Sequence, residues 1–106
     1  MFDITLKNGE SYKESDFYSP GSELKITKVL GHSVGHTICY DLRYPKLYRA
    51  LAKKGSQIIV VPSAFTHTTG KAHWHSLIKA RAIENGVFIL APNQWGVNNE
   101  KRVTYG

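Results

Sequence analysis

Two short runs of apolar residues place the tightest limits on how this chain can fold. Gln57–Val61 reads QIIVV and Val87–Ala91 reads VFILA, and neither run alternates between apolar and polar residues. Continuous runs of this kind are typical of strands that are buried on both faces of a parallel sheet. Parallel strands need long crossover connections, so the residues between the runs are expected to form a helix.

Two segments have the apolar spacing of such crossover helices. Residues 44–54 carry apolar side chains at the i, i+3, i+4, i+7 and i+8 positions, with Pro45 in the first turn and Gly55 after the last turn. Residues 72–85 have a similar stripe of apolar side chains on one face of the predicted helix. We therefore predict helices over 44–54 and 72–85, with a loop over 62–70 before the second helix.

The rest of the chain predicts two more strands and a sheet that is covered on one face. Residues 23–29 and 33–39 have the patterns of strands, whereas 1–22 is rich in turn formers and 92–106 is expected to be loop. The order of elements predicts an α/β fold with a largely parallel sheet. If both helices lie on one face, the other face is bare apolar surface. We therefore expect a piece of a larger α/β domain, or a chain that pairs with another.

Composition excludes several classes of protein. A chain of 106 residues suffices for one small domain, and no apolar run approaches the roughly 20 residues of a membrane helix. The single cysteine, Cys39, excludes a scaffold held by intramolecular disulfides, and the N-terminus has no apolar signal core. These observations favour a cytoplasmic protein with no membrane partner. The net charge of +6 is spread along the chain, which favours a solvated surface over a nucleic-acid groove.

Cys39 is the residue best suited to covalent chemistry. It lies at the carboxyl end of a predicted strand, before a turn and a helix, and open α/β sheets place their active sites at that edge. A helix N-terminus nearby can lower the pKa of a thiol, and the backbone N–H of Tyr40 could stabilise an oxyanion. The alternative is an inert core thiol, because cysteine is among the most frequently buried residue types.

Other polar residues surround the same predicted edge. Arg43 could bind an anionic group of a substrate, or it could brace the turn through Asp41 or Glu84. Asp41 could equally cap the following helix. Phe65 and Thr66 follow the QIIVV strand and could line a pocket beside Cys39.

The predicted second helix carries further candidates. Arg81 and Glu84 are three residues apart, so they form either a surface pair or part of a buried network. The histidines His67, His73 and His75 suggest a metal site. His73 and His75, however, are two residues apart and face nearly opposite sides of a helix, which argues against one.

Several longer stretches resemble the carbon–nitrogen hydrolase (nitrilase) superfamily. They are FDI, GESYKESD and SPGSEL near the start, then ICYDLRYPKLYRALAKKG, QIIVVPSAFT, TGKAHWHSLIKARAIEN, NQWG and NEKRVTYG. They follow one colinear order over nearly all 106 residues. The branch they resemble most comprises the amidases that act on deaminated glutathione and related ω-amides.

The resemblance implies a partial αββα sandwich of the nitrilase type, mostly one sheet with two helices, spanning residues 1–106. It implies a Glu–Lys–Cys triad with Cys39 as nucleophile, the N–H of Tyr40 as oxyanion donor, and Phe65 and Thr66 at the substrate pocket. No cofactor or metal is implied, and the expected partners are a small amide substrate and either further copies or a complementing chain. Structural support is assigned to five residues: Asp41, Arg43, Arg81, Glu84 and Asn85.

The resemblance also indicates what residues 1–106 lack. The family domain is more than twice this length, and the positions of its glutamate and lysine fall before Met1. We therefore expect a fragment of an ω-amide hydrolase that is inactive by itself. The alternative is a non-catalytic module that pairs with a second chain. Two positions depart from the family pattern, since Lys46 and His75 each stand where an acidic residue is usual.

Overall fold

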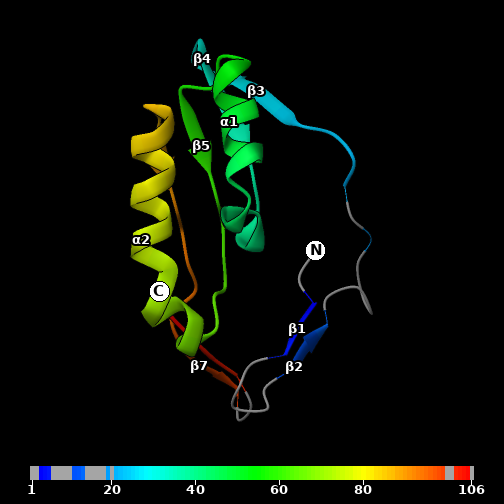
Figure 1. The fold of residues 1–106 in the computed structure, drawn as a ribbon, viewed down its shortest axis with the longest axis vertical. Helices are drawn as coiled ribbons and strands as arrows, with labels where there is room; N and C mark the ends of the chain where they lie inside the picture. The colour runs from blue at the N-terminus through cyan, green and yellow to red at the C-terminus, as the bar shows by residue number, and fades with distance from the viewer. Residues whose placement is uncertain (1–2, 6–10, 14–18, 20, 100–101, 106) are drawn as a thin grey trace.

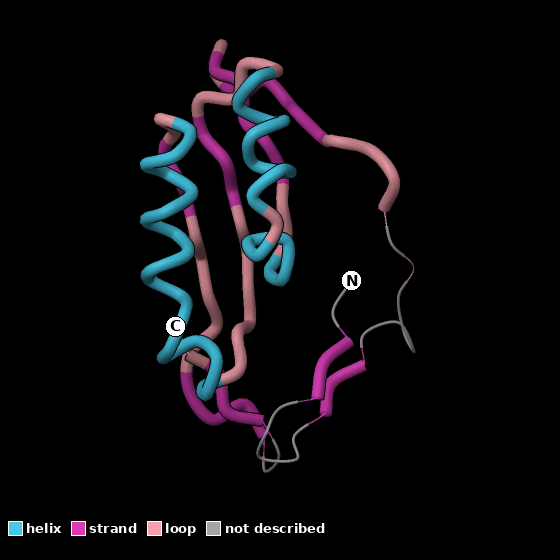
Figure 2. The backbone as a smooth tube through the Cα atoms, viewed as in Figure 1, coloured by secondary structure: helices cyan, strands magenta, loops and turns pink. Residues whose placement is uncertain are grey.

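The computed structural model describes residues 3–5, 11–13, 19, 21–99 and 102–105 (Figures 1 and 2). None of the described helices is both long and apolar enough to cross a membrane. The described elements, in chain order, are β1 (Asp3–Thr5), β2 (Ser11–Lys13), β3 (Lys25–Val29), β4 (His32–His36), the 3-10 helix η2 (Cys39–Arg43), α1 (Pro45–Lys53), β5 (Ile58–Val60), α2 (His67–Asn85), β6 (Phe88–Leu90), β7 (Gly96–Asn99) and β8 (Arg102–Thr104).

A four-stranded sheet in the order β3-β4-β5-β6 forms the centre of the fold. Strands β4, β5 and β6 are parallel, with Gly35 opposite Ile59 and Ile59 opposite Ile89. Strand β3 pairs antiparallel with β4, so the sheet is mixed. The α1 and α2 crossovers connect the parallel strands, which confirms the α/β class predicted from the two apolar runs.

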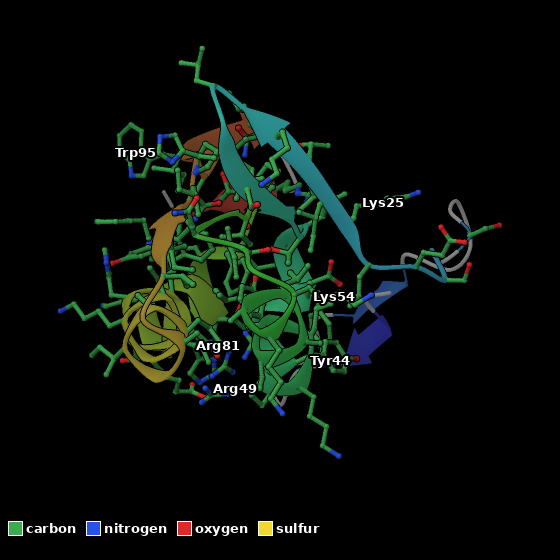
Figure 3. All side chains as sticks on the ribbon, turned by 90° about the horizontal axis from the view of Figure 1, so that it is seen from above. Lys25, Tyr44, Arg49, Lys54, Arg81 and Trp95 are labelled. Carbon is green, nitrogen blue, oxygen red and sulfur yellow. The ribbon has the colours of Figure 1, made fainter. Side chains whose placement is uncertain are left out.

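Both helices cover the same face of this sheet. Figure 1 shows α1 and α2 side by side with β5 visible between them, and Figure 3 places Arg49 and Arg81 on the side of the helices and Trp95 away from them. On strand β6, Phe88 is 76% exposed and Leu90 is 55% exposed. The expected uncovered apolar surface is therefore present. The buried apolar core under the helices consists of Leu42, Tyr48, Leu51, Ile59, Val61, Phe65, Trp74 and Val87.

The structure differs most from the sequence prediction in three places. Strand β4 ends at His36, so Cys39 lies outside the strand that was expected to reach it. Helix α2 begins at His67 and includes part of the segment that was predicted to be a loop. The tail forms the β7–β8 hairpin instead of a loop, because Gly96 adopts a φ of +105° and Thr104 pairs with Thr66.

Gly70 explains why α2 starts earlier than predicted. A glycine in this segment indicated a loop, but here it allows Tyr105 to pack directly against the helix backbone. A Cβ atom at Gly70 would lie closer to the Cβ atom of Tyr105 than two such atoms come in proteins. Such a distance is not possible without movement of one of the two segments.

We expect Gly70→Ala to lower the free energy of unfolding by about 1–3 kcal/mol, because overpacking outweighs the better helix propensity of alanine. Urea unfolding followed by circular dichroism measures this change. The matched control is Gly21→Ala, since nothing lies within 4 Å of a Cβ atom there. A Gly70→Ala protein as stable as the unmodified chain would show that Tyr105 is not held against α2.

Candidate active site around Cys39

Cys39 occupies a strained backbone position at the carboxyl end of the parallel strands. Its φ is +47°, in the left-handed region that non-glycine residues rarely adopt. This conformation costs on the order of 1–3 kcal/mol and persists only where the surrounding structure enforces it. Such positions cluster at active sites, and the side chain here is half-buried.

Hydrogen bonds on both sides of Cys39 hold this turn. The N–H of Cys39 donates to the carbonyl oxygen of Pro62 at 3.0 Å, which ties the turn to the segment after β5. The N–H of Ile38 donates to Oδ2 of Asp41 at 2.9 Å. Asp41 therefore caps η2, and the suggestion that it caps α1 is wrong, because the N-cap of α1 is Tyr44.

A buried pair of hydroxyl groups lies just before the turn. The hydroxyl groups of Thr37 and Tyr48 are 2.6 Å apart, and Thr37 Oγ1 also donates to the carbonyl oxygen of Val60 at 2.9 Å. Tyr48 has no solvent exposure, and this burial raises its pKa from 10.0 to about 12. Tyr48 belongs to the apolar stripe of residues 44–54, and that stripe gives no sign of the polar contact with Thr37.

This raised pKa predicts a loss of stability at alkaline pH. As the pH rises above 10, the phenol of Tyr48 ionises first in the unfolded state, because its folded-state pKa is about 12. The stabilising contribution is fully present below pH 10 and falls by about 1.4 kcal/mol per pH unit up to pH 12. Urea unfolding at pH 8, 10 and 11 should reveal this slope.

Two phenylalanine variants separate Tyr48 from the other tyrosines. In Tyr48→Phe the free energy of unfolding should fall less steeply above pH 10 than in the unmodified protein. In Tyr44→Phe, whose side chain is 49% exposed, the slope should be unchanged. Equal slopes for Tyr48→Phe and the unmodified protein would contradict the assignment.

A buried arginine connects α2 to the helix that carries Cys39. Arg81 is 7% exposed, and its Nε donates to the carbonyl oxygen of Leu42 in η2 at 3.0 Å. Its Nη1 forms a 2.7 Å ion pair with Glu84 Oε1, and Asn85 Nδ2 donates to the Arg81 carbonyl at 2.9 Å. Neither of the two alternatives holds for the whole pair, since Arg81 is buried whereas the side chain of Glu84 is 37% exposed.

Arg43 lies near two aromatic rings beside the turn. Its Cζ atom is 5.6 Å from the ring centroid of Tyr40 and 5.3 Å from that of Phe65. Its Nη1 and Nη2 atoms are both 3.3 Å from Nδ1 of His73. The suggestion that Arg43 braces the turn through Asp41 or Glu84 is therefore wrong. No local sequence signal indicates the contact with His73, because the two residues are 30 positions apart.

The loop between β5 and α2 is fixed by the C-terminal segment. The N–H of Phe65 donates to Asn93 Oδ1 at 3.2 Å, and the N–H of Tyr105 donates to the Phe65 carbonyl at 3.0 Å. The ring centroids of Phe65 and Trp74 are 4.7 Å apart. Phe65 and Thr66 are both buried, and their role as pocket residues stays a prediction.

The three histidines of α2 do not all share the same neighbour. His67 and His75 lie 5.9 Å and 5.8 Å from the ring of Tyr105, whereas His73 contacts Arg43. In the part of the chain that the structure describes, no three His, Cys, Asp or Glu side chains gather as metal ligands would. The backbone N–H of Tyr40, proposed as an oxyanion donor, also stays a prediction.

Comparison with known proteins gives consistent matches over the whole chain. The family model described as carbon-nitrogen hydrolase matches residues 1–106. A deaminated glutathione amidase of Yersinia enterocolitica is 48% identical over all of this chain and 37% of its own length. The crystal structure of the C. elegans NitFhit protein superposes with a TM-score of 0.90 at 40% identity, over all of this chain and 26% of that one.

An amidase from Nesterenkonia sp. AN1 is a more distant structural neighbour. It matches 88% of this chain and 36% of its own chain with a TM-score of 0.76 and 29% identity. In that structure, which is of a mutant of the amidase, acrylamide has added to the active-site cysteine. The present chain spans 37–40% of the length of the first three curated amidases that it matches.

Proposed function

The chain belongs to the carbon–nitrogen hydrolase family, and from this premise we propose that it supplies the cysteine nucleophile of an amidase. The observation that carries the proposal is the left-handed conformation of Cys39, held by hydrogen bonds to Pro62 and Asp41. A strained turn between a strand and a helix can present a nucleophile at the edge of a sheet. The reactive cysteine of the Nesterenkonia amidase supports the same assignment.

The proposed reaction proceeds in two steps. The sulfur of Cys39 attacks the amide carbon, and the C–N bond then breaks, so that ammonia leaves and a thioester remains. Water next attacks the thioester carbon, which releases the acid and returns the thiol. The N–H of Tyr40 would stabilise the oxyanion formed in each step. The base and the lysine of the family triad have no matching position in residues 1–106, so the remaining part of a domain must supply them.

Arg43 suggests which amides would be substrates. It forms no ion pair with a carboxylate among the described residues, and its guanidinium lies beside the turn that carries Cys39. A guanidinium without a counterion suits a substrate carboxylate, which can accept two parallel hydrogen bonds. The proposed substrates are therefore small ω-amides with a free carboxylate. Similarity to amidases of deaminated glutathione supports this class.

Reactivity of the thiol tests the assignment of Cys39. We expect native Cys39 to react with iodoacetamide at least about tenfold faster than the same thiol in urea, because an activated nucleophile is accessible and an inert core cysteine is not. Mass spectrometry of the alkylated chain at pH 7 measures both rates. A native rate equal to or below the unfolded rate would identify Cys39 as a buried structural residue.

A second candidate function is a non-catalytic module that pairs with another chain. The exposed apolar residues Phe88 and Leu90 on the open face of the sheet favour it. Sedimentation of the purified chain would detect association. Association without rapid alkylation of Cys39 would support this candidate over the amidase.

A further inference from the structure

The guanidinium of Arg43 is held by side chains from three different parts of the fold. Tyr40 belongs to η2, Phe65 to the loop after β5, and His73 to α2. The two rings approach the guanidinium carbon to 5.6 Å and 5.3 Å, and His73 approaches both terminal nitrogens to 3.3 Å. These three contacts together restrict the freedom of the guanidinium.

The chemistry of these groups assigns the proton positions. A guanidinium has five N–H donors and no acceptor, so Nδ1 of His73 must accept the hydrogen bonds from Arg43. The imidazole is therefore neutral, with its proton on Nε2. Because only two donors point at His73, three N–H groups of Arg43 remain for another acceptor.

The charge of Arg43 is not balanced by the protein in the described segment 21–99. The acidic side chains of that segment have other partners: Glu23 pairs with Lys25, Asp41 accepts from Ile38, and Glu84 pairs with Arg81. A half-buried cation that is held in place by neutral groups can bind an anion with little further loss of side-chain freedom.

We propose that His73 is a positioning residue, which holds Arg43 in the orientation that binds the carboxylate of the substrate. This proposal rests on the proposed function for the identity of the substrate. It assigns to His73 a role that its neighbours His67 and His75, which contact Tyr105, do not share.

Binding of two small amides to the chain of residues 1–106 tests the proposal. Succinamate carries one carboxylate and one amide, whereas succinamide is its neutral diamide, and NMR titration gives the affinity of each. We expect the unmodified chain to prefer succinamate. His73→Phe should weaken succinamate binding at least about tenfold and leave succinamide unchanged. His73→Asn should restore most of the preference, because its side-chain oxygen can replace Nδ1 as acceptor.

Two further measurements complete the test. Nitrogen NMR of the unmodified chain should show His73 with its proton on Nε2, which does not depend on whether any variant folds. Arg49→Ala, which removes an exposed arginine on α1, should leave succinamate binding unchanged. Equal affinity for the two amides, unchanged binding in His73→Phe, or a proton on Nδ1 would each overturn the proposal.

The proposed function can fail independently of this inference. If His73 controls succinamate binding but no complete domain hydrolyses amides, the carboxylate site stands and the amidase assignment falls. If a complete domain hydrolyses amides without any preference for a carboxylate, the amidase assignment stands and the role of His73 is wrong.

Discussion

Replacing Cys39 by alanine should lower the rate of amide hydrolysis by roughly four to six powers of ten in a complete domain that contains residues 1–106. The loss is large because no covalent intermediate can form without the sulfur, and the remaining groups of a catalytic unit then contribute little. A suitable protein joins this chain to the remaining part of the Yersinia enterocolitica amidase, with which it shares 48% identity over the matched region. Ammonia release from an ω-amide measures the rate.

Two controls make this result specific. Ser76→Ala changes an exposed residue of α2 and should leave the rate within about twofold. Residues 1–106 alone should show no Cys39-dependent turnover, because the base and the lysine of the triad are not supplied. A folded joined protein in which Cys39→Ala retains a rate within tenfold of the parent would exclude Cys39 as the nucleophile.

The central fold could be predicted because its signals are local. The runs QIIVV and VFILA became β5 and β6, since continuous apolar runs are typical of the strands of a parallel sheet. The stripe of residues 44–54 became α1 within one residue at each end. Each of these signals is contained in fewer than a dozen consecutive residues.

The boundaries that were wrong depend on contacts between distant segments. Gly70 indicates a loop when it is considered alone, and only Tyr105 packing against it explains why it lies inside α2. The turn at Cys39 is similar, because its left-handed backbone is stabilised by the carbonyl of Pro62, 23 residues further along the chain. Sequence periodicity contains no information about either contact.

In the candidate site, too, local signals could be predicted and contacts between distant segments could not. Cys39 and Asp41 were identified from their position between a strand and a helix, and the structure places them together in η2. The partners of the neighbouring residues were not identified, because Arg43 contacts His73 across 30 positions and Phe65 contacts Asn93 across 28. Residue type suggested which side chains were chemically suited, and only the tertiary structure showed which of them meet.

Arg81 is the residue whose removal should destabilise the described fold most. We expect Arg81→Met to lower the free energy of unfolding by about 3 kcal/mol, because the carbonyl of Leu42 loses a charged donor in a buried location. Methionine keeps most of the apolar volume, so the effect reports the polar contacts more than a cavity. A small domain is stable by only about 5–15 kcal/mol, so this loss is a large fraction of the total.

One further variant tests the ion pair of Arg81, and another serves as a control on α1. Glu84→Gln removes only the ion pair at a partly exposed carboxylate and should cost less than about 1 kcal/mol. Arg49→Met removes an exposed arginine of α1 and should change stability by less than about 0.5 kcal/mol. Urea unfolding of the three variants gives the comparison. If Arg81→Met cost no more than Glu84→Gln, the hydrogen bond from Arg81 to Leu42 would not hold η2 against α2, and the turn at Cys39 would depend on Pro62 and Asp41 alone.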